Sequence, residues 1–183
     1  MKSMFLQHSM DNTIQSWGDI DFPWMKKKYP EVREIFKDQI NFDPEEVLFL
    51  AGICGYQPNP YFDESYYVQR YDDVRSAINK GEFISGFDHY RKIGFKDRNP
   101  HWLFSEEYYL NRYADVSRAL VNESAFSNGY DHYIRCGDKE YRTGSWFFDP
   151  LEYLKSISDV DVKRPFYHYI QNPKANVDSI YFD

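Results

Sequence analysis

The sequence contains an internal repeat with a period of about 42 residues. Residues 62–100 and 104–144 carry the same residue types in the same order. The matched positions are Tyr71 with Tyr113, Asp73 with Asp115, His89 with His132, Tyr90 with Tyr133, and Gly94 with Gly137. A repeat of this length, with turn residues inside it, is typical of architectures in which each unit buries its apolar face on a neighbour.

Two weaker copies flank this pair. Residues 20–60 keep the first half of the pattern, but Phe49 and Leu50 stand where the later copies have the His-Tyr pair. Residues 148–173 form a shortened copy. End units are expected to be atypical because one of their faces has no neighbour. The predicted organisation is an N-terminal arm, 1–19, a repeat domain, 20–173, with units 20–60, 61–100, 101–147 and 148–173, and a C-terminal tail, 174–183.

Each well-formed unit has the signals of three short helices. Asp63 is placed to cap the first helix, and Gly81 stops the second. Ser85 has the form of a capping-box residue for the third helix, and Gly94 and Gly137 are predicted to end that helix in the left-handed conformation. No alternation typical of strands is present. The sequence therefore predicts an all-α fold of about four imperfect repeats, stacked into one compact array.

Composition argues against several classes of function. A net charge of −7 and a pI near 5.2 disfavour nucleic-acid binding, which needs a basic surface. The longest apolar run, 47–56, is too short to span a bilayer, and the first residues do not resemble a secretory signal. We therefore expect the cytoplasm or a particle rather than secretion. Cys54 and Cys136 lie in different units and do not suggest a disulfide framework.

The recurring polar residues are interpreted as structural anchors. There is one repeat histidine per unit, so the rings do not converge on a metal ion, and each is expected to bond a backbone carbonyl or an acidic side chain of its own unit. Asp73 and Asp115 are expected to cap helices or to form buried pairs with Arg98 or Arg142. The sequence predicts no catalytic residue, no cofactor site and no metal site.

Aromatic residues make up 20% of the chain. The first tyrosine of each Tyr-Tyr pair and the phenylalanine before each Asp are expected in the core. Some of the 17 tyrosines are expected at the rim, and tyrosine and tryptophan rings there can stack on sugars or form the centre of a protein interface.

These residues resemble a repeat family of bacterial, cyanobacterial and marine phage proteins. Its pattern is roughly F-D-x-x-Y-Y-L-x-x-Y-P-D-V, then G-x-F-x-S-G-x-x-H-Y, then G-x-x-E-G-R-x-P. The matching residues of the second unit are Phe62, Asp63, Tyr66, Tyr67, Tyr71, Asp73, Val74, Gly81, Phe83, Ser85, Gly86, His89, Tyr90, Gly94, Arg98 and Pro100. The resemblance spans about 20–173 and implies an accessory module of the kind attached to glycosyltransferases, polysaccharide-related proteins and large secreted proteins. It implies no catalytic residues.

The function expected from the sequence is that of a non-enzymatic structural or adaptor protein, a component of a larger assembly such as a virion. Its partners are expected to be proteins or further copies of itself, with no nucleic acid and no membrane insertion. Apolar residues of the arm and tail are the predicted contacts, because an apolar cluster needs a surface to rest on: Met4, Phe5, Leu6, Trp17, Tyr181 and Phe182. The alternative is a carbohydrate-binding accessory module of a glycosyltransferase or surface-polysaccharide system.

Overall fold

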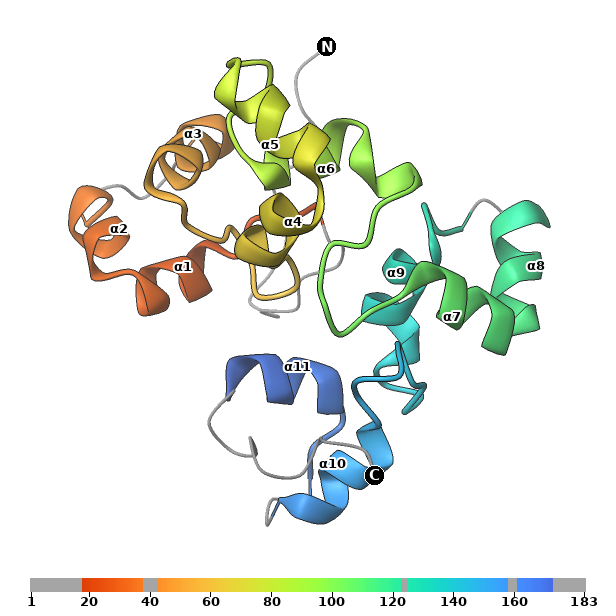
Figure 1. Cartoon of the computed structure of the whole chain (residues 1–183). Helices are drawn as coiled ribbons and strands as arrows, with labels where there is room; N and C mark the ends of the chain where they lie inside the picture. The colour runs from red at the N-terminus through yellow and green to blue at the C-terminus, as the bar shows by residue number, and fades with distance from the viewer. Residues whose placement is uncertain (1–17, 38–42, 123–124, 158–160, 173–183) are drawn as a thin grey trace.

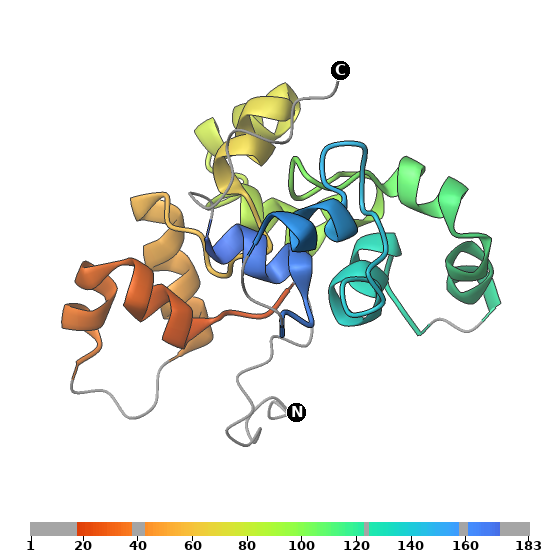
Figure 2. The same ribbon diagram turned by 90° about the horizontal axis from the view of Figure 1, so that it is seen from below.

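The protein folds into short α-helices joined by capped turns (Figures 1 and 2). The computed structural model describes residues 18–37, 43–122, 125–157 and 161–172. The helices are α1 (Phe22–Lys28), α2 (Pro30–Ile35), α3 (Pro44–Cys54), α4 (Glu64–Arg70), α5 (Asp72–Asn79), α6 (Gly86–Lys92), α7 (Glu106–Arg112), α8 (Ala114–Asn122), α9 (Gly129–His132), α10 (Pro150–Ser156) and α11 (Pro165–Gln171). A 3₁₀ turn, Gly94–Lys96, follows α6, and a π turn, Tyr133–Gly137, follows α9. No β-strand occurs in these ranges, and the all-α prediction is confirmed.

The helices α1, α4, α7 and α10 each begin at a side-chain cap. The carboxylate of Asp63 accepts a hydrogen bond from the amide of Tyr66 at 2.9 Å, as predicted. Asp21, Ser105 and Asp149 accept equivalent bonds at the starts of α1, α7 and α10. Free amides at a helix start need such acceptors, so these four residues determine where the helices begin.

The third helix is capped in the way that its sequence predicts. Ser85 Oγ accepts from the amide of Asp88 at 3.1 Å, and Asn128 Oδ1 accepts from that of Asp131 at 2.7 Å. The two aspartates in turn accept a hydrogen bond from the amide of the residue before the cap. In this reciprocal arrangement, two backbone amides at the helix start have a side-chain acceptor.

Helices pack first with their neighbours in the chain. The contacts pair α1 with α2, α4 with α5, α7 with α8, and α10 with α11, while α6 lies on α4 and α5, and α9 on α7 and α8 (Figure 1). Backbone hydrogen bonds then join the residue before α1, α4 and α7 to the turn before α4, α7 and α10, respectively. These bonds run from Asp21 N to Pro58 O, from Asp63 N to Pro100 O and from Ser105 N to Gly144 O, at 2.9, 3.0 and 3.1 Å.

These bonds correct the alignment of the first unit, residues 20–60, with the second. Asp21 and Pro58 both precede their counterparts by 42 positions, so Val47 and Leu48 correspond to His89 and Tyr90. Val47 and Leu48 are buried, whereas Phe49 is exposed. The expected correspondence of Phe49 and Leu50 with the His-Tyr pair is therefore wrong.

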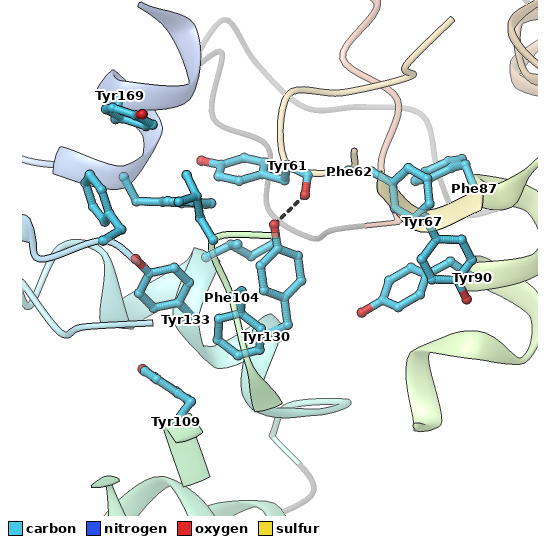
Figure 3. Packing of buried hydrophobic residues seen from close by; sticks show 14 of the residues in the cluster. Tyr61, Phe62, Tyr67, Phe87, Tyr90, Phe104, Tyr109, Tyr130, Tyr133 and Tyr169 are labelled. Carbon is cyan, nitrogen blue, oxygen red and sulfur yellow. Dashed lines mark hydrogen bonds between the residues drawn. The ribbon is translucent and has the colours of Figure 1, made fainter. Parts of the chain in front are cut away.

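The buried side chains form two clusters. A smaller one lies between α1, α2 and α3, and a larger aromatic one extends from Leu48 to Tyr169. Figure 3 shows part of the larger cluster, in which the hydroxyl of Tyr130 donates to the backbone carbonyl of Tyr61. This bond joins segments 69 residues apart in the chain.

The last helix packs against several earlier segments rather than only against the one before it. The ring of Phe166 on α11 contacts the rings of Tyr61, His101, Tyr133 and Phe148. In addition, the indole nitrogen of Trp24 donates to Gln171 Oε1 at 3.0 Å, which links the first described helix to the last. The protein is compact, as expected, but it is closed by these long-range contacts and is not a simple linear stack.

Candidate interaction surfaces

The repeat histidines are structural, but their partner differs from the expected one. The Tyr67 hydroxyl bonds His89 Nδ1 at 2.9 Å, and the Tyr109 hydroxyl bonds His132 Nδ1 at 2.9 Å. Burial lowers the pKa of both histidines. The expected carbonyl or acidic partner is wrong, because the second tyrosine of each Tyr-Tyr pair points inward and supplies the hydroxyl.

The same observation corrects the expected core positions. Tyr67 and Tyr109 are fully buried, while the first tyrosines of the pairs, Tyr66 and Tyr108, are only partly buried. The phenylalanine before each first helix is buried as expected: Phe62, Phe104 and Phe148. Each of the first two lies within 5.4 Å of the inner tyrosine ring, measured between centroids, so the helix turns its second tyrosine toward the core.

Gly94 and Gly137 are needed for close packing and not for a left-handed turn. Gly55 and Gly81 are the described glycines with positive φ. A Cβ at Gly94 would lie 2.1 Å from the Tyr67 hydroxyl oxygen, and one at Gly137 would lie 2.2 Å from that of Tyr109. The prediction of a left-handed C-terminus is therefore wrong, and the glycine is there because the buried tyrosine hydroxyl occupies the space of a side chain. The anchors Tyr90 and Tyr133 are fully buried.

Asp73 and Asp115 bind the predicted arginines at the surface. Arg98 Nη2 lies 2.9 Å from Asp73 Oδ2, and Arg142 makes two bonds to Asp115, at 3.1 and 2.8 Å. Both carboxylates are more than half exposed, so the expectation of buried pairs is wrong. Each arginine also covers a tyrosine ring, at 4.7 and 4.8 Å from the ring centres. Exposed pairs of this kind contribute little stability individually.

Sequence reasoning missed three carboxylates, of which Asp138 is buried and Glu64 and Glu106 are partly buried. Glu64 accepts from the amides of Gly86 and Phe87, Glu106 accepts from two amides at the start of α9, and Asp138 accepts from two at the start of α11. Burial raises the pKa of all three carboxyls, and the amide bonds oppose this shift. A signal was present, because Glu64 and Glu106 are 42 positions apart.

The described residues contain no group of three His, Cys, Asp or Glu side chains placed to hold a metal ion. None of their helices is long and apolar enough to cross a membrane. Cys54 and Cys136 are both thiols. The predicted contacts of the arm and tail, Met4, Phe5, Leu6, Trp17, Tyr181 and Phe182, lie outside the described residues.

One exposed apolar patch lies on α3. Its inner face, with Val47, Leu48 and Ala51, is core. Its outer face carries Phe49 and Ile53, which are 55% and 66% exposed. Ile84 lies against the same helix at Gly52, where a Cβ would be 2.3 Å from Ile84 Cγ2. We call Phe49, Ile53 and Ile84 the α3 surface.

A second patch is aromatic and lies where the turns before α7 and α10 meet. Trp146 is 69% exposed and packs edge-on against Tyr108, with 4.5 Å between ring centres. Trp102 and Phe147, also exposed, have ring centres 6.3 Å apart. We call Trp102, Tyr108, Trp146 and Phe147 the tryptophan surface.

The two tryptophans occupy matching places in two turns, one before α7 and one before α10. His101 Nδ1 accepts from the amide of Leu103, and Ser145 Oγ accepts from that of Phe147, so Trp102 and Trp146 are each the middle residue of the same turn. Sequence reasoning overlooked them, although two tryptophans 44 positions apart, just outside the recurring core residues, were a visible signal.

The chain was compared with protein-family models, curated proteins and solved structures, and none of them matches. The two surfaces are therefore the basis of the functional argument.

Proposed function

We propose that this protein is a non-enzymatic adaptor, a structural component of a larger protein assembly, and that the α3 surface binds its protein partner. The observation that carries the proposal is the apolar outer face of α3, a helix whose opposite face already belongs to the core. Four imperfect repeats of the aromatic family described above form the scaffold in this proposal. The arm and tail supply further contacts.

Beyond its first turn α3 carries apolar residues on both faces, and a helix that is hydrophobic all round is normally covered all round. Phe49 and Ile53 are four positions apart, so they form one stripe on the helix, and Ile84 extends the stripe onto the turn before α6. These side chains are 41–66% exposed, so burying the rest of each would contribute about 1–2 kcal/mol before the cost of association is counted. This is the composition of the centre of a protein interface.

Charge around the α3 surface narrows the kind of partner. Glu45 and Glu46, at the start of α3, are both exposed, and the whole chain has a net charge of −7. Like charges facing each other oppose association, whereas opposite charges speed it and help to orient the partner. We therefore propose a partner with an apolar patch that is bordered by lysine or arginine.

The test uses charged substitutions with a matched control. Ile53→Lys introduces a charge into the α3 surface, and Val121→Lys makes the same change at an apolar residue outside that surface that is 82% exposed. Chemical cross-linking with mass spectrometry on particles or lysate identifies the partner and the contact residues. Binding of the purified partner is then measured for the unmodified protein, for Ile53→Lys and for Val121→Lys.

We expect Ile53→Lys to weaken binding at least about tenfold, which is 1.4 kcal/mol, while Val121→Lys binds like the unmodified protein. Both variants should keep the thermal stability of the parent, because the substituted side chains are exposed. A partner that binds the Ile53→Lys variant unchanged would show that the α3 surface is not its site. Native mass spectrometry on the same samples reports whether the partner is a second copy.

A further inference from the structure

The tryptophan surface has a different composition from the α3 surface, and it points to a different ligand. We propose that the tryptophan surface binds a neutral oligosaccharide by stacking sugar rings on Trp146 and Trp102. This binding activity goes beyond the adaptor function and does not depend on it.

The rings are available for stacking from solvent. Trp146 is 69% and Trp102 41% exposed, and each has a second aromatic ring beside it. The turn that carries each indole is also fixed, because its first residue, His101 or Ser145, is buried and bonds the backbone two residues on. A ring fixed before binding loses little conformational entropy when a ligand stacks on it.

Hydrogen-bonding groups lie next to these rings. The guanidinium of Arg112 is 5.9 Å from the centre of the Tyr108 ring. Burial raises the pKa of the Tyr108 hydroxyl, and the positive charge of Arg112 opposes this shift. Asp149 follows Trp146 by three positions in the chain. Asp149 caps α10 through one oxygen, Oδ1, which accepts both helix amides. Its second oxygen takes no part in the cap.

This set of groups fits the two sides of a sugar ring. A pyranose has an apolar face of C–H groups, which packs on an aromatic face, and a perimeter of hydroxyls, which both donate and accept hydrogen bonds. Arg112 supplies donors in a planar fork, Asp149 supplies an acceptor, and Tyr108 supplies a hydroxyl that does both. The α3 surface has no such group among its three members, all of which are apolar.

The charge of the protein indicates that the sugar is neutral. A chain with a net charge of −7 repels sulfated or uronic-acid polymers at a distance. Two exposed indoles, on the turns before α7 and α10, also favour a chain of sugars over a single residue, because a chain can stack on more than one ring.

The experiment follows the four indole N–H signals of the full chain in ¹H–¹⁵N spectra during titration with oligosaccharides. The probes are hexamers of β-1,4-glucose, β-1,3-glucose, α-1,4-glucose and β-1,4-mannose at millimolar concentrations, with a hexamer of galacturonic acid as the charged comparison. Trp146→Ala and Trp102→Ala assign the signals and remove one ring each. Arg112→Lys keeps the charge but loses the planar fork, and Phe49→Ala is the matched control on the α3 surface.

We expect at least one neutral hexamer to shift the Trp146 and Trp102 signals and the acidic hexamer to leave them unchanged. Trp146→Ala should weaken that binding about tenfold and Arg112→Lys severalfold, while Phe49→Ala binds the sugar normally. The proposal is overturned if no neutral hexamer shifts these signals, or if Trp146→Ala binds the hexamer as tightly as the parent protein. It is also overturned if Trp146→Ala instead loses the protein partner. Loss of the partner in the Ile53→Lys variant is a separate result, so the two proposals fail independently.

Discussion

The close contact between Gly137 and the Tyr109 hydroxyl predicts a specific energetic coupling. In Gly137→Ala the new methyl carbon would lie 2.2 Å from that oxygen, far inside van der Waals contact. Tyr109 has little room to move, because its hydroxyl bonds His132 and its ring packs on Phe104 and Tyr133. Forcing an extra methyl into a packed core costs about 1–3 kcal/mol.

Removing the hydroxyl should make room for that methyl. Tyr109→Phe alone should cost about 1–3 kcal/mol, because it leaves the buried His132 without its partner. In the double variant the nearest atoms to the new methyl are Tyr133 Cδ2 at 3.1 Å and Tyr109 Cζ at 3.3 Å, which small shifts can accommodate. The double variant should therefore be about as stable as Tyr109→Phe alone, and the coupling should be about 1–3 kcal/mol.

The assay is urea unfolding of the parent, the two single variants and the double variant, followed by circular dichroism. The control cycle pairs Tyr109→Phe with Gly81→Ala. Gly81 has φ +76°, and a Cβ at this position would have no other atom within 4 Å, so alanine there should cost about 1–2 kcal/mol through the backbone alone. That cost should add to the cost of Tyr109→Phe. Additive energies in the Gly137 cycle would refute the steric explanation for the repeat glycine.

Three further predictions follow from the core and its closure. Burial lowers the pKa of His101 to about 4, so the stability that its neutral ring contributes is complete above its unfolded pKa near 6.5 and is lost as the pH falls toward 4. The free energy of unfolding should therefore fall by about 2 kcal/mol between pH 7 and pH 5. His101→Asn should remove this fall, since Asn59 accepts the equivalent bond from the amide two residues on with a side chain that does not titrate. Equal losses in urea unfolding of the parent and of His101→Asn would contradict this assignment. Asp138→Asn should lower the free energy of unfolding by about 3 kcal/mol, because the nearly buried guanidinium of Arg164 then has no counter-charge. Adding Arg164→Met should restore part of that free energy. Urea unfolding in which the double variant is no more stable than Asp138→Asn would argue against the ion pair. Cutting the chain at Asn99-Pro100 should leave neither half with a cooperative thermal transition, because the contacts of Tyr61 with Tyr130 and Phe166 and of Trp24 with Gln171 cross the cut; circular dichroism of the two fragments checks this, and two cooperative helical halves would show that the segments fold independently.

Local features of this protein could be read from the sequence because they depend on neighbouring residues. The caps at Asp63 and Ser85 and the helix stop at Gly81 involve atoms within a few positions of each other, so residue type and order are sufficient to predict them. The pairing of Asp73 with Arg98 was also predictable, because the same acid and the same arginine recur one period later. Periodicity showed which residues matter to each copy.

Periodicity did not show what each recurring residue touches, and only the tertiary structure decided that. The partner of His89 is a tyrosine 22 positions earlier, and the reason for Gly94 is the hydroxyl of that same tyrosine. Neither contact is local, so the residue types alone left a backbone partner and a left-handed turn as reasonable alternatives.

The candidate surfaces depended on tertiary structure for the same reason. Phe49 and Val47 are similar apolar residues on one short helix, but only the packing of the core determines which one faces solvent. Trp102 and Trp146 meet Phe147 and Tyr108 because the turns before α7 and α10 come together in the fold. The exposure of a side chain depends on how the helices pack together, whereas a repeat in the sequence shows only that the same packing pattern occurs more than once.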